Sequence, residues 1–204
     1  GALFLSPGET GHVRVDYFNA DGGHASFCAN GTRCAARYAV RHQLVARVNP
    51  TLETGWGPIE ARVDGERVTL ALPSVSPPGD PIPISGRGLP PTAIPLEVGV
   101  PHLVVFLRGD LGKLAIDRLA PPLRNHPKLP DGANVNFVKT AGANRIEVRT
   151  FERGVEGETL SCGSGVVAAA IAAGRQGMAA SPVACGTKSG VELSVEPGER
   201  RLVG

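Results

Sequence analysis

The chain has 204 residues, of which 42% are hydrophobic and 20% are charged, a balance typical of a globular protein that buries a core. The net charge is only +2 and aromatic residues make up 4%, which argues against a nucleic-acid-binding or membrane-surface protein. The longest apolar run, residues 166–173, is too short to cross a bilayer. We therefore expect no membrane segment.

The predicted elements are strands and two helices of small residues. Alternating or continuous apolar patterns between turn residues predict strands at 13–18, 57–63, 67–72, 103–107, 134–139, 145–151 and 190–195. Helical spacing of alanines predicts helices at 31–44, with Ala35, Ala36 and Ala39 on its buried face, and at 163–173. The eight prolines between residues 73 and 95 exclude a helix there and indicate an extended connector.

The two halves of the chain repeat one pattern. In each half a Val-x-x-Phe strand is followed by a C-x-x-G turn, a helix, and a Thr-x-x-Gly motif that begins the next strand. The matching residues are Val15 and Val148, Cys28 and Cys162, and Thr54 and Thr187. The pattern predicts an α/β fold of two pseudo-symmetric lobes, with an N-terminal lobe at 1–72, the connector at 73–95 and a C-terminal lobe at 96–204. The first-lobe equivalent of His102 would precede residue 1, so we expect the chain to be a fragment without its opening hairpin.

Cys28 and Cys162 each stand at the expected beginning of a helix. The free N–H groups and partial positive charge of a helix N-terminus stabilise a thiolate, which predicts lowered pKa values for both thiols. The same N–H groups bind carboxylates. Two such turns facing one cleft would hold a substrate carboxylate between them, with one thiol on each side of the α-carbon. One thiolate could then remove the α-proton while the other thiol protonates the opposite face, which inverts the stereocentre without a metal or pyridoxal.

Other readings of the cysteines stay open. Cysteine is commonly buried as a small apolar residue, and we expect that role for Cys34 and Cys185. Cys28 and Cys162 could instead form a disulfide on oxidation. No C-x-x-C pair or finger-like histidine spacing occurs, so we expect no metal site. Four cysteines are too few for a disulfide scaffold, which favours a reducing, cytoplasmic location.

Four segments resemble those of the diaminopimelate epimerase family. They are Asn19–Gly22 with Cys28–Cys34, then Gly99–His102, Pro130–Phe137, and the long match Glu152–Gly165. The resemblance runs from about Leu3 to the end. It implies two lobes, each a mostly antiparallel sheet wrapped around a central helix. It also implies a homodimer that needs no cofactor and epimerises the free amino acid LL-diaminopimelate to the meso form, for lysine and peptidoglycan synthesis.

The resemblance also implies the site residues. Cys28 and Cys162 match the catalytic acid and base, assisted by His102 and Glu152. The substrate-binding positions are Asn19, Ala29, Asn30, Asn134, Glu152, Arg153, Gly163 and Ser164. From the residues alone, His102 would be a core histidine, and Asn19 and Asn134 could be turn residues. Arg153 could be a surface charge, but the glycine-rich loop beside it favours a functional role.

Two positions depart from the family pattern. Val100 stands where the family usually has Asn, which removes an amide that could bind polar groups of the substrate. Ala29 replaces a usual Gly but keeps the backbone N–H. The alternatives are therefore a proline- or histidine-type racemase, an isomerase without a cysteine pair, and a non-catalytic binding protein. The paired cysteines and Glu152 disfavour the last two.

Overall fold

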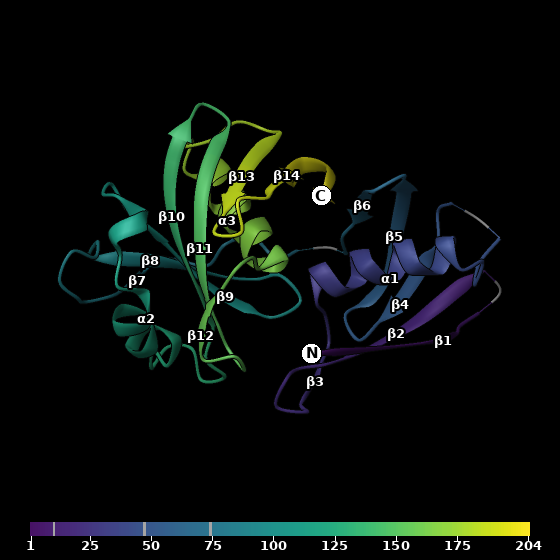
Figure 1. Ribbon diagram of the computed structural model, residues 1–204. Helices are drawn as coiled ribbons and strands as arrows, with labels where there is room; N and C mark the ends of the chain where they lie inside the picture. Colours follow the sequence, from purple (N-terminus) through teal and green to yellow (C-terminus); the bar gives the residue numbers. More distant parts are fainter. Residues whose placement is uncertain (10, 47, 74) are drawn as a thin grey trace.

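The computed structural model of the chain describes residues 1–9, 11–46, 48–73 and 75–204, and Figure 1 shows two lobes side by side. The first lobe contains β1 (Ala2–Pro7), β2 (His12–Phe18), β3 (His24–Ala25), α1 (Ala29–Arg41), β4 (Thr51–Thr54), β5 (Gly57–Asp64) and β6 (Arg67–Ala71). The second lobe begins with β7 (Ile82–Pro83), β8 (Thr92–Glu97), β9 (Pro101–Phe106), η1 (Leu111–Lys113) and α2 (Ile116–Arg124). It continues with β10 (Asn134–Gly142), β11 (Arg145–Glu152), β12 (Gly157–Thr159), α3 (Gly163–Arg175), β13 (Val183–Thr187), β14 (Glu192–Glu196), η2 (Pro197–Glu199) and β15 (Arg201–Val203).

One continuous path of paired strands crosses both lobes in the order β1-β2-β4-β5-β6-β15-β14-β13-β11-β10-β9-β8-β7. The short strands β3 and β12 branch from β2 and β11. The lobes join at the middle of this path, where β6 pairs antiparallel with β15 and Leu70 lies opposite Leu202. Most pairings are antiparallel, as the resemblance implied.

The repeat seen in the sequence is a repeat of structure. In the first lobe β2 and β4 run parallel and α1 connects them, and in the second lobe α3 connects the parallel strands β11 and β13. The registers correspond, because His12 lies opposite Thr51 and Arg145 lies opposite Ala184. The Thr-x-x-Gly motifs form the hairpin turns that follow, in which Gly57 has a φ of 118° and Gly190 a φ of 81°. Glycine suits both positions because a side chain disfavours positive φ.

The two long helices pack in different ways. On α1 the buried residues include Ala35, Ala36 and Ala39, as the alanine spacing predicted. The second helix, α3, is buried over nearly its whole length, from Gly163 to Ala173. A helix that is apolar on every side belongs inside a protein, so α3 forms the centre of the second lobe.

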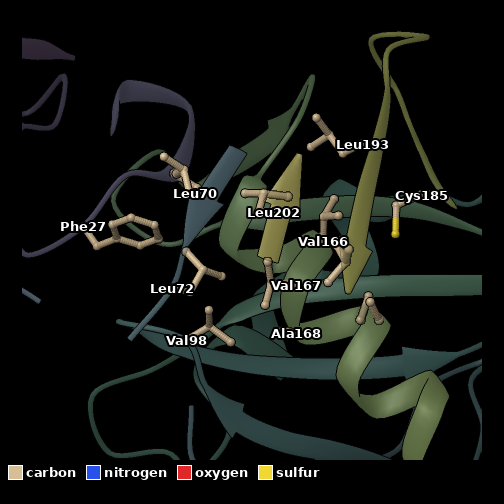
Figure 2. Packing of buried hydrophobic residues seen from close by; sticks show 14 of the residues in the cluster. Phe27, Leu70, Leu72, Val98, Val166, Val167, Ala168, Cys185, Leu193 and Leu202 are labelled. Atoms are coloured by element: carbon tan, nitrogen blue, oxygen red, sulfur yellow. The ribbon is translucent and has the colours of Figure 1, made fainter. Parts of the chain in front are cut away.

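The main hydrophobic core extends across both lobes. Figure 2 shows Leu70 and Leu72 beside Leu202, with Val166 and Val167 of α3 next to them. Leu70 and Leu202 are fully buried. A second core, beneath α2, contains Leu103, Val135 and Phe137 of the second lobe. The shared core fixes how the two lobes meet, and therefore how α1 and α3 are placed.

Several elements escaped sequence analysis. The strands β1, β4, β8, β13 and β15 are short or carry mixed patterns. Helix α2 holds Pro121 and Pro122, which are strongly unfavourable in an isolated helix, yet it forms because it buries Ile116, Ala120 and Leu123. The predicted connector contains no helix in its described residues, and it includes β7 and the start of β8. No helix in the described part of the chain is long and apolar enough to span a membrane.

The prediction that Cys34 is a core residue is wrong, because this residue is exposed. Its neighbours Ala35 and Ala36 take the inner face of α1, so the helical rotation turns Cys34 outward. Cys185, by contrast, is buried on β13 as expected.

Candidate active site

Helices α1 and α3 both begin at one cleft between the lobes. The cleft has a volume of about 440 Å³. Of the residues singled out from the sequence, those that line it are Asn19, Cys28, Ala29, Asn30, Val100, Asn134, Glu152, Arg153, Cys162, Gly163 and Ser164. The structure therefore gathers residues from six separate stretches of the chain at one place.

The first cysteine turn caps α1. Cys28 has extended backbone angles, and its Sγ accepts a hydrogen bond from the backbone N–H of Gly31 at 3.4 Å. The hydroxyl of Thr32 donates to the Cys28 carbonyl at 2.9 Å, which closes the first helical turn. Cys28 is half-buried, so its sulfur is accessible from the cleft.

The second cysteine turn caps α3 in the same way. The Sγ of Cys162 accepts from the backbone N–H of Gly165 at 3.4 Å and lies 3.5 Å from the hydroxyl of Ser164. Each thiol is thus an N-cap that uses its sulfur where serine or aspartate would use an oxygen. Cys162 differs from Cys28 in being buried, with only 7% of its surface exposed.

The surroundings of Cys162 overturn one prediction from the sequence. Burial and the nearby Glu152 carboxylate raise the pKa of the Cys162 thiol, and the bonds from Ser164 and Gly165 offset only part of this effect. The predicted fall of this pKa is therefore wrong, because loss of solvent around a thiolate outweighs the helix N-terminus. A thiol with a raised pKa keeps its proton at neutral pH.

Glu152 lies close to Cys162. It ends β11, and its Oε1 accepts a hydrogen bond from the Thr159 hydroxyl at 2.5 Å. Burial raises the pKa of Glu152, while hydrogen bonds from Thr159 and Cys162 lower it. A partly desolvated carboxylate that a thiol contacts can serve as a base for that thiol.

The helix beginnings meet across the cleft. A Cβ placed on Gly163 would lie only 2.5 Å from the Cβ of Ala29, so these two residues are in close contact. The first turns of both helices, with their free N–H groups, therefore lie next to each other in the cleft. Two helix N-termini at one point favour an anion such as a carboxylate.

The polar residues at the cleft edge are held by the backbone around them. Asn134 is buried, and its Oδ1 accepts from the backbone N–H of Arg153 at 2.7 Å. The Arg153 guanidinium donates to the carbonyl of Asp131 at 2.7 Å. Asn19, from the first lobe, lies against Gly154, whose φ of 82° and lack of a side chain allow this approach.

The structure does not bring His102 to the surface of the cleft. Its ring is completely buried, its Nδ1 lies 3.1 Å from the Nδ2 of Asn136, and its Nε2 has no hydrogen-bond partner in the part of the chain that the structure describes. Burial lowers the pKa of His102 to about 3, so the ring is neutral. Its assisting role in catalysis stays a prediction.

Sequence analysis missed Tyr17 and Thr159, which also line the cleft. Burial, followed by the charge of Cys28 and a hydrogen bond to its thiol, raises the pKa of Tyr17 to about 12. Strand alternation did not mark Tyr17, since it lies on the same face as the buried Val13 and Val15 and would pass for one more residue of that face. No sequence signal marked Thr159, because its role depends on the β11–β12 pairing that places it beside Glu152.

The group of Glu9, His12 and Glu53 is the cluster of potential metal ligands found in the described residues. It does not line the cleft. His12 is hydrogen-bonded to Glu53 at 3.0 Å, and the guanidinium of Arg14 lies 3.9 Å from the same carboxylate. The prediction that no metal takes part in the chemistry of the site stays a prediction.

Comparison with known proteins places this geometry in a wider context. A profile of the family described as diaminopimelate epimerase matches residues 95–203. A diaminopimelate epimerase from Methanothrix thermoacetophila is 39% identical over 203 residues, which cover 93% of this chain and 70% of that protein. One from Archaeoglobus fulgidus is 39% identical over 210 residues, covering 96% of this chain and 72% of that protein.

Solved structures show the same fold at lower sequence identity. A probable proline racemase from Agrobacterium radiobacter K84 has a TM-score of 0.73 at 16% identity and covers 99% of this chain and 72% of its own. A phenazine biosynthesis protein of the PhzF family from Enterococcus faecalis has a TM-score of 0.69 at 18% identity, over 98% of this chain and 76% of its own. These matches confirm the predicted mixed α/β fold.

Proposed function

Because this chain belongs to the diaminopimelate epimerase family, whose members are isomerases, we propose that it converts LL-diaminopimelate to meso-diaminopimelate with Cys28 and Cys162 as the acid–base pair. The observation that carries the proposal is the pair of cysteine N-caps, one from each lobe, that line one cleft. Inversion at one carbon needs a proton acceptor on one face and a proton donor on the other. Two thiols on opposite lobes meet that need.

The substrate's α-carboxylate would lie between the two helix beginnings. The backbone N–H groups of Ala29, Asn30, Gly163 and Ser164 would bind its oxygens. When the α-proton leaves, the electron pair of the broken C–H bond spreads into this carboxylate. The fixed N–H groups then stabilise the added negative charge, so the carbanion needs no pyridoxal or metal to accept it.

The protonation states suggest an order of events for one direction of the reaction. Burial and Glu152 keep Cys162 protonated in the free protein, so Cys162 would begin as the acid. Cys28, as thiolate, would take the α-proton, and Cys162 would give its own proton to the other face of the carbon. The returning electron pair forms the new C–H bond, and the two thiols end with their protonation states exchanged. Cys162, now a thiolate, would regain a proton through Glu152, which takes one from solvent and passes it on, while Cys28 releases its proton to solvent.

The remaining polar residues would recognise the distal part of the substrate. Asn19, Asn134 and Arg153 lie at the cleft edge beyond the cysteines and offer amide and guanidinium groups to a carboxylate or an amine. Val100 lines the same cleft and offers only apolar contact. Its position makes it the first residue to substitute if the enzyme prefers another amino acid.

We propose that the enzyme acts in the cytoplasm as a homodimer on the free amino acid. Light scattering coupled to size-exclusion chromatography at micromolar concentration tests the dimer, since a monomeric mass would contradict it.

The decisive experiment follows solvent deuterium into the α-carbon. The full-length protein is incubated with LL-diaminopimelate in D₂O under reducing conditions, and mass spectrometry and NMR monitor label and stereochemistry. We expect one deuterium per inversion and formation of the meso isomer. Cys28→Ala and Cys162→Ala should each lower the rate at least about 100-fold, because each removes one general acid–base group.

Cys34→Ser is the matched control, since Cys34 is an exposed thiol on the same helix that also lines the cleft. It should leave the rate within about twofold of the parent protein. Absence of label from the parent protein with reduced thiols would overturn the substrate assignment. The same assay with proline, hydroxyproline and histidine would then identify a different amino acid.

A further inference from the structure

We propose that Asn30 is a positioning residue that links the two cysteine turns, and that Arg33 acts through it by orienting its side-chain amide. The Nδ2 of Asn30, in the first turn of α1, donates to the backbone carbonyl of Ser161 at 2.9 Å. Ser161 immediately precedes Cys162. This hydrogen bond therefore runs from one lobe to the other and ends one residue from the second thiol.

Arg33 determines which way the Asn30 amide faces. The Nη2 of Arg33 contacts the Oδ1 of Asn30 at 3.0 Å. A guanidinium can only donate, so it must face the amide oxygen, and a carbonyl can only accept, so Ser161 must face the amide nitrogen. Both partners therefore require the same orientation, and the amide cannot flip without losing both bonds.

Arg33 is itself held in place by packing. Burial of its guanidinium lowers its pKa from the ordinary value, and its Nη1 is buried without a hydrogen-bond partner among the described residues. The C-terminal residue Gly204 lies against the same guanidinium, 3.5 Å from Cζ to a Cβ built on that glycine. A half-buried arginine whose guanidinium donates to the Asn30 oxygen is well placed to fix that oxygen.

The linkage operates over a short distance. Ala29 and Gly163 are already in contact, and the Oδ1 of Asn30 lies 3.4 Å from a Cβ built on Gly163. The Asn30 bond and the Ala29–Gly163 contact together join the residues next to each thiol. A shift of this joint would change the spacing of the two sulfurs directly.

The link starts from α1, and the equivalent positions of α3 carry different residues. At the position in α3 that corresponds to Asn30 stands Ser164, whose hydroxyl contacts the Cys162 sulfur of its own turn. The position that corresponds to Arg33 is Val167, a core residue. The pseudo-symmetric repeat is thus broken at these two positions, and α1 alone supplies the link.

The reason that the spacing of the two sulfurs matters rests on the proposed function, because two thiols must reach one α-carbon from opposite faces. A misplacement of about 1 Å can reduce a rate about 100-fold even when every reacting group is present. The contacts themselves do not depend on which amino acid is the substrate.

Cross-linking measures the spacing without a substrate. Dibromobimane joins two nearby thiols, each sulfur displacing one bromide with loss of its proton, and it fluoresces when both have reacted. In a full-length Cys34→Ser background, mass spectrometry gives the fraction of protein in which Cys28 and Cys162 are joined. We expect Asn30→Ala to lower this fraction at least threefold, because the turns lose their bond while the backbone N–H at position 30 remains.

Arg33→Met should lower the cross-linked fraction to a similar extent, and the double variant should be no worse than Asn30→Ala alone, because Arg33 acts through Asn30. Arg33→Lys, which keeps a charge and a donor, should recover part of the loss. Arg37→Met is the matched control, since Arg37 lies on the same helix but pairs with the exposed Glu66. It should cross-link like the parent protein.

The same variants in the deuterium assay should show a fall in kcat of about tenfold or more with a KM changed less than threefold. Unchanged cross-linking in Asn30→Ala, or additive losses in the double variant, would overturn the proposal. Loss of cross-linking together with no epimerase activity in the parent protein would uphold the linkage and reject the proposed function instead.

Discussion

The two cysteine turns are alike in backbone and different in environment. Both sulfurs accept from the N–H three residues on, at 3.4 Å, and both residues have extended backbone angles. Cys28, however, is half-buried and lies near Tyr17, whereas Cys162 is buried beside Glu152 and Ser164. The local motif therefore fixes where each thiol points, and the tertiary surroundings raise the pKa of Cys162. The two cysteines therefore occupy equivalent positions in the sequence repeat but have different surroundings.

The strongest test of this difference is the glycine that ends each turn. A Cβ on Gly165 would lie 2.2 Å from the Oδ1 of Asn136, which is buried and bonded to Thr150. A Cβ on Gly31 would meet nothing closer than the flexible side chain of Leu3, at 3.2 Å. We expect Gly165→Ala to lower the free energy of unfolding by about 2–3 kcal/mol, as overpacking does. Gly31→Ala should lower it by less than about 1 kcal/mol.

Urea unfolding of both variants measures these changes, and epimerase activity should fall much more for Gly165→Ala. Equal losses at the two glycines would show that the buried support behind Cys162 has no special rigidity.

A smaller effect concerns the histidine behind the second turn. His102 has a pKa of about 3 in the folded protein, against an ordinary value of about 6.5, because burial disfavours its charged form. Between these two pKa values the unfolded chain carries a proton on this histidine and the folded protein does not. The stability that neutral His102 provides is complete above about pH 6.5 and decreases as the pH falls toward 3.

Between pH 7.5 and 5.5 we expect this histidine to remove about 1.4 kcal/mol from the free energy of unfolding. His102→Gln keeps a hydrogen-bonding group but cannot titrate, so its unfolding free energy should depend less on pH by that amount. Urea titrations of both proteins at the two pH values measure it. Identical pH dependence would mean that the pKa of His102 in the folded protein is close to its ordinary value.

The smallest expected effect concerns the carboxylate beside the second thiol. The Glu152 carboxylate raises the pKa of Cys162, so Glu152→Gln should lower this pKa toward its ordinary value. We expect alkylation of Cys162 by iodoacetamide at pH 8 to become about three- to fivefold faster, since a larger share is thiolate. Peptide mass spectrometry reads each cysteine separately, and Cys28 serves as the internal reference. An unchanged Cys162 rate would mean that burial alone raises the pKa.

Much of the fold could be predicted because its signals are local. Alternation located β2, β5, β10 and β11, and alanine spacing located α1 and α3 to within a few residues of their ends. The C-x-x-G repeat located both thiols and so indicated a two-sided site. Helix α2 was missed because Pro121 and Pro122 oppose it locally, and only the burial of its apolar face makes it stable.

The sequence predicted which residues form the candidate site, but it did not predict their burial or their pKa values. The resemblance supplied Asn19, Asn134, Glu152 and Arg153, and the structure places them in one cleft with both thiols. Cys34 was expected in the core because cysteine is commonly buried, but it is exposed, because Ala35, Ala36 and Ala39 take the inner face of α1. Tyr17 and Thr159 enter the site through strand pairing, which links residues far apart in sequence.

The sequence by itself determined the two lobes, the two helix-capping cysteines and the family, because each depends on short-range pattern or on motifs that can be read in order. Only the tertiary structure decided that Cys162 is the buried, protonated thiol, that His102 lies away from the cleft, and that Asn30 links the lobes. Burial, pKa and contacts between lobes depend on which distant segments come together. No stretch of the chain encodes them alone.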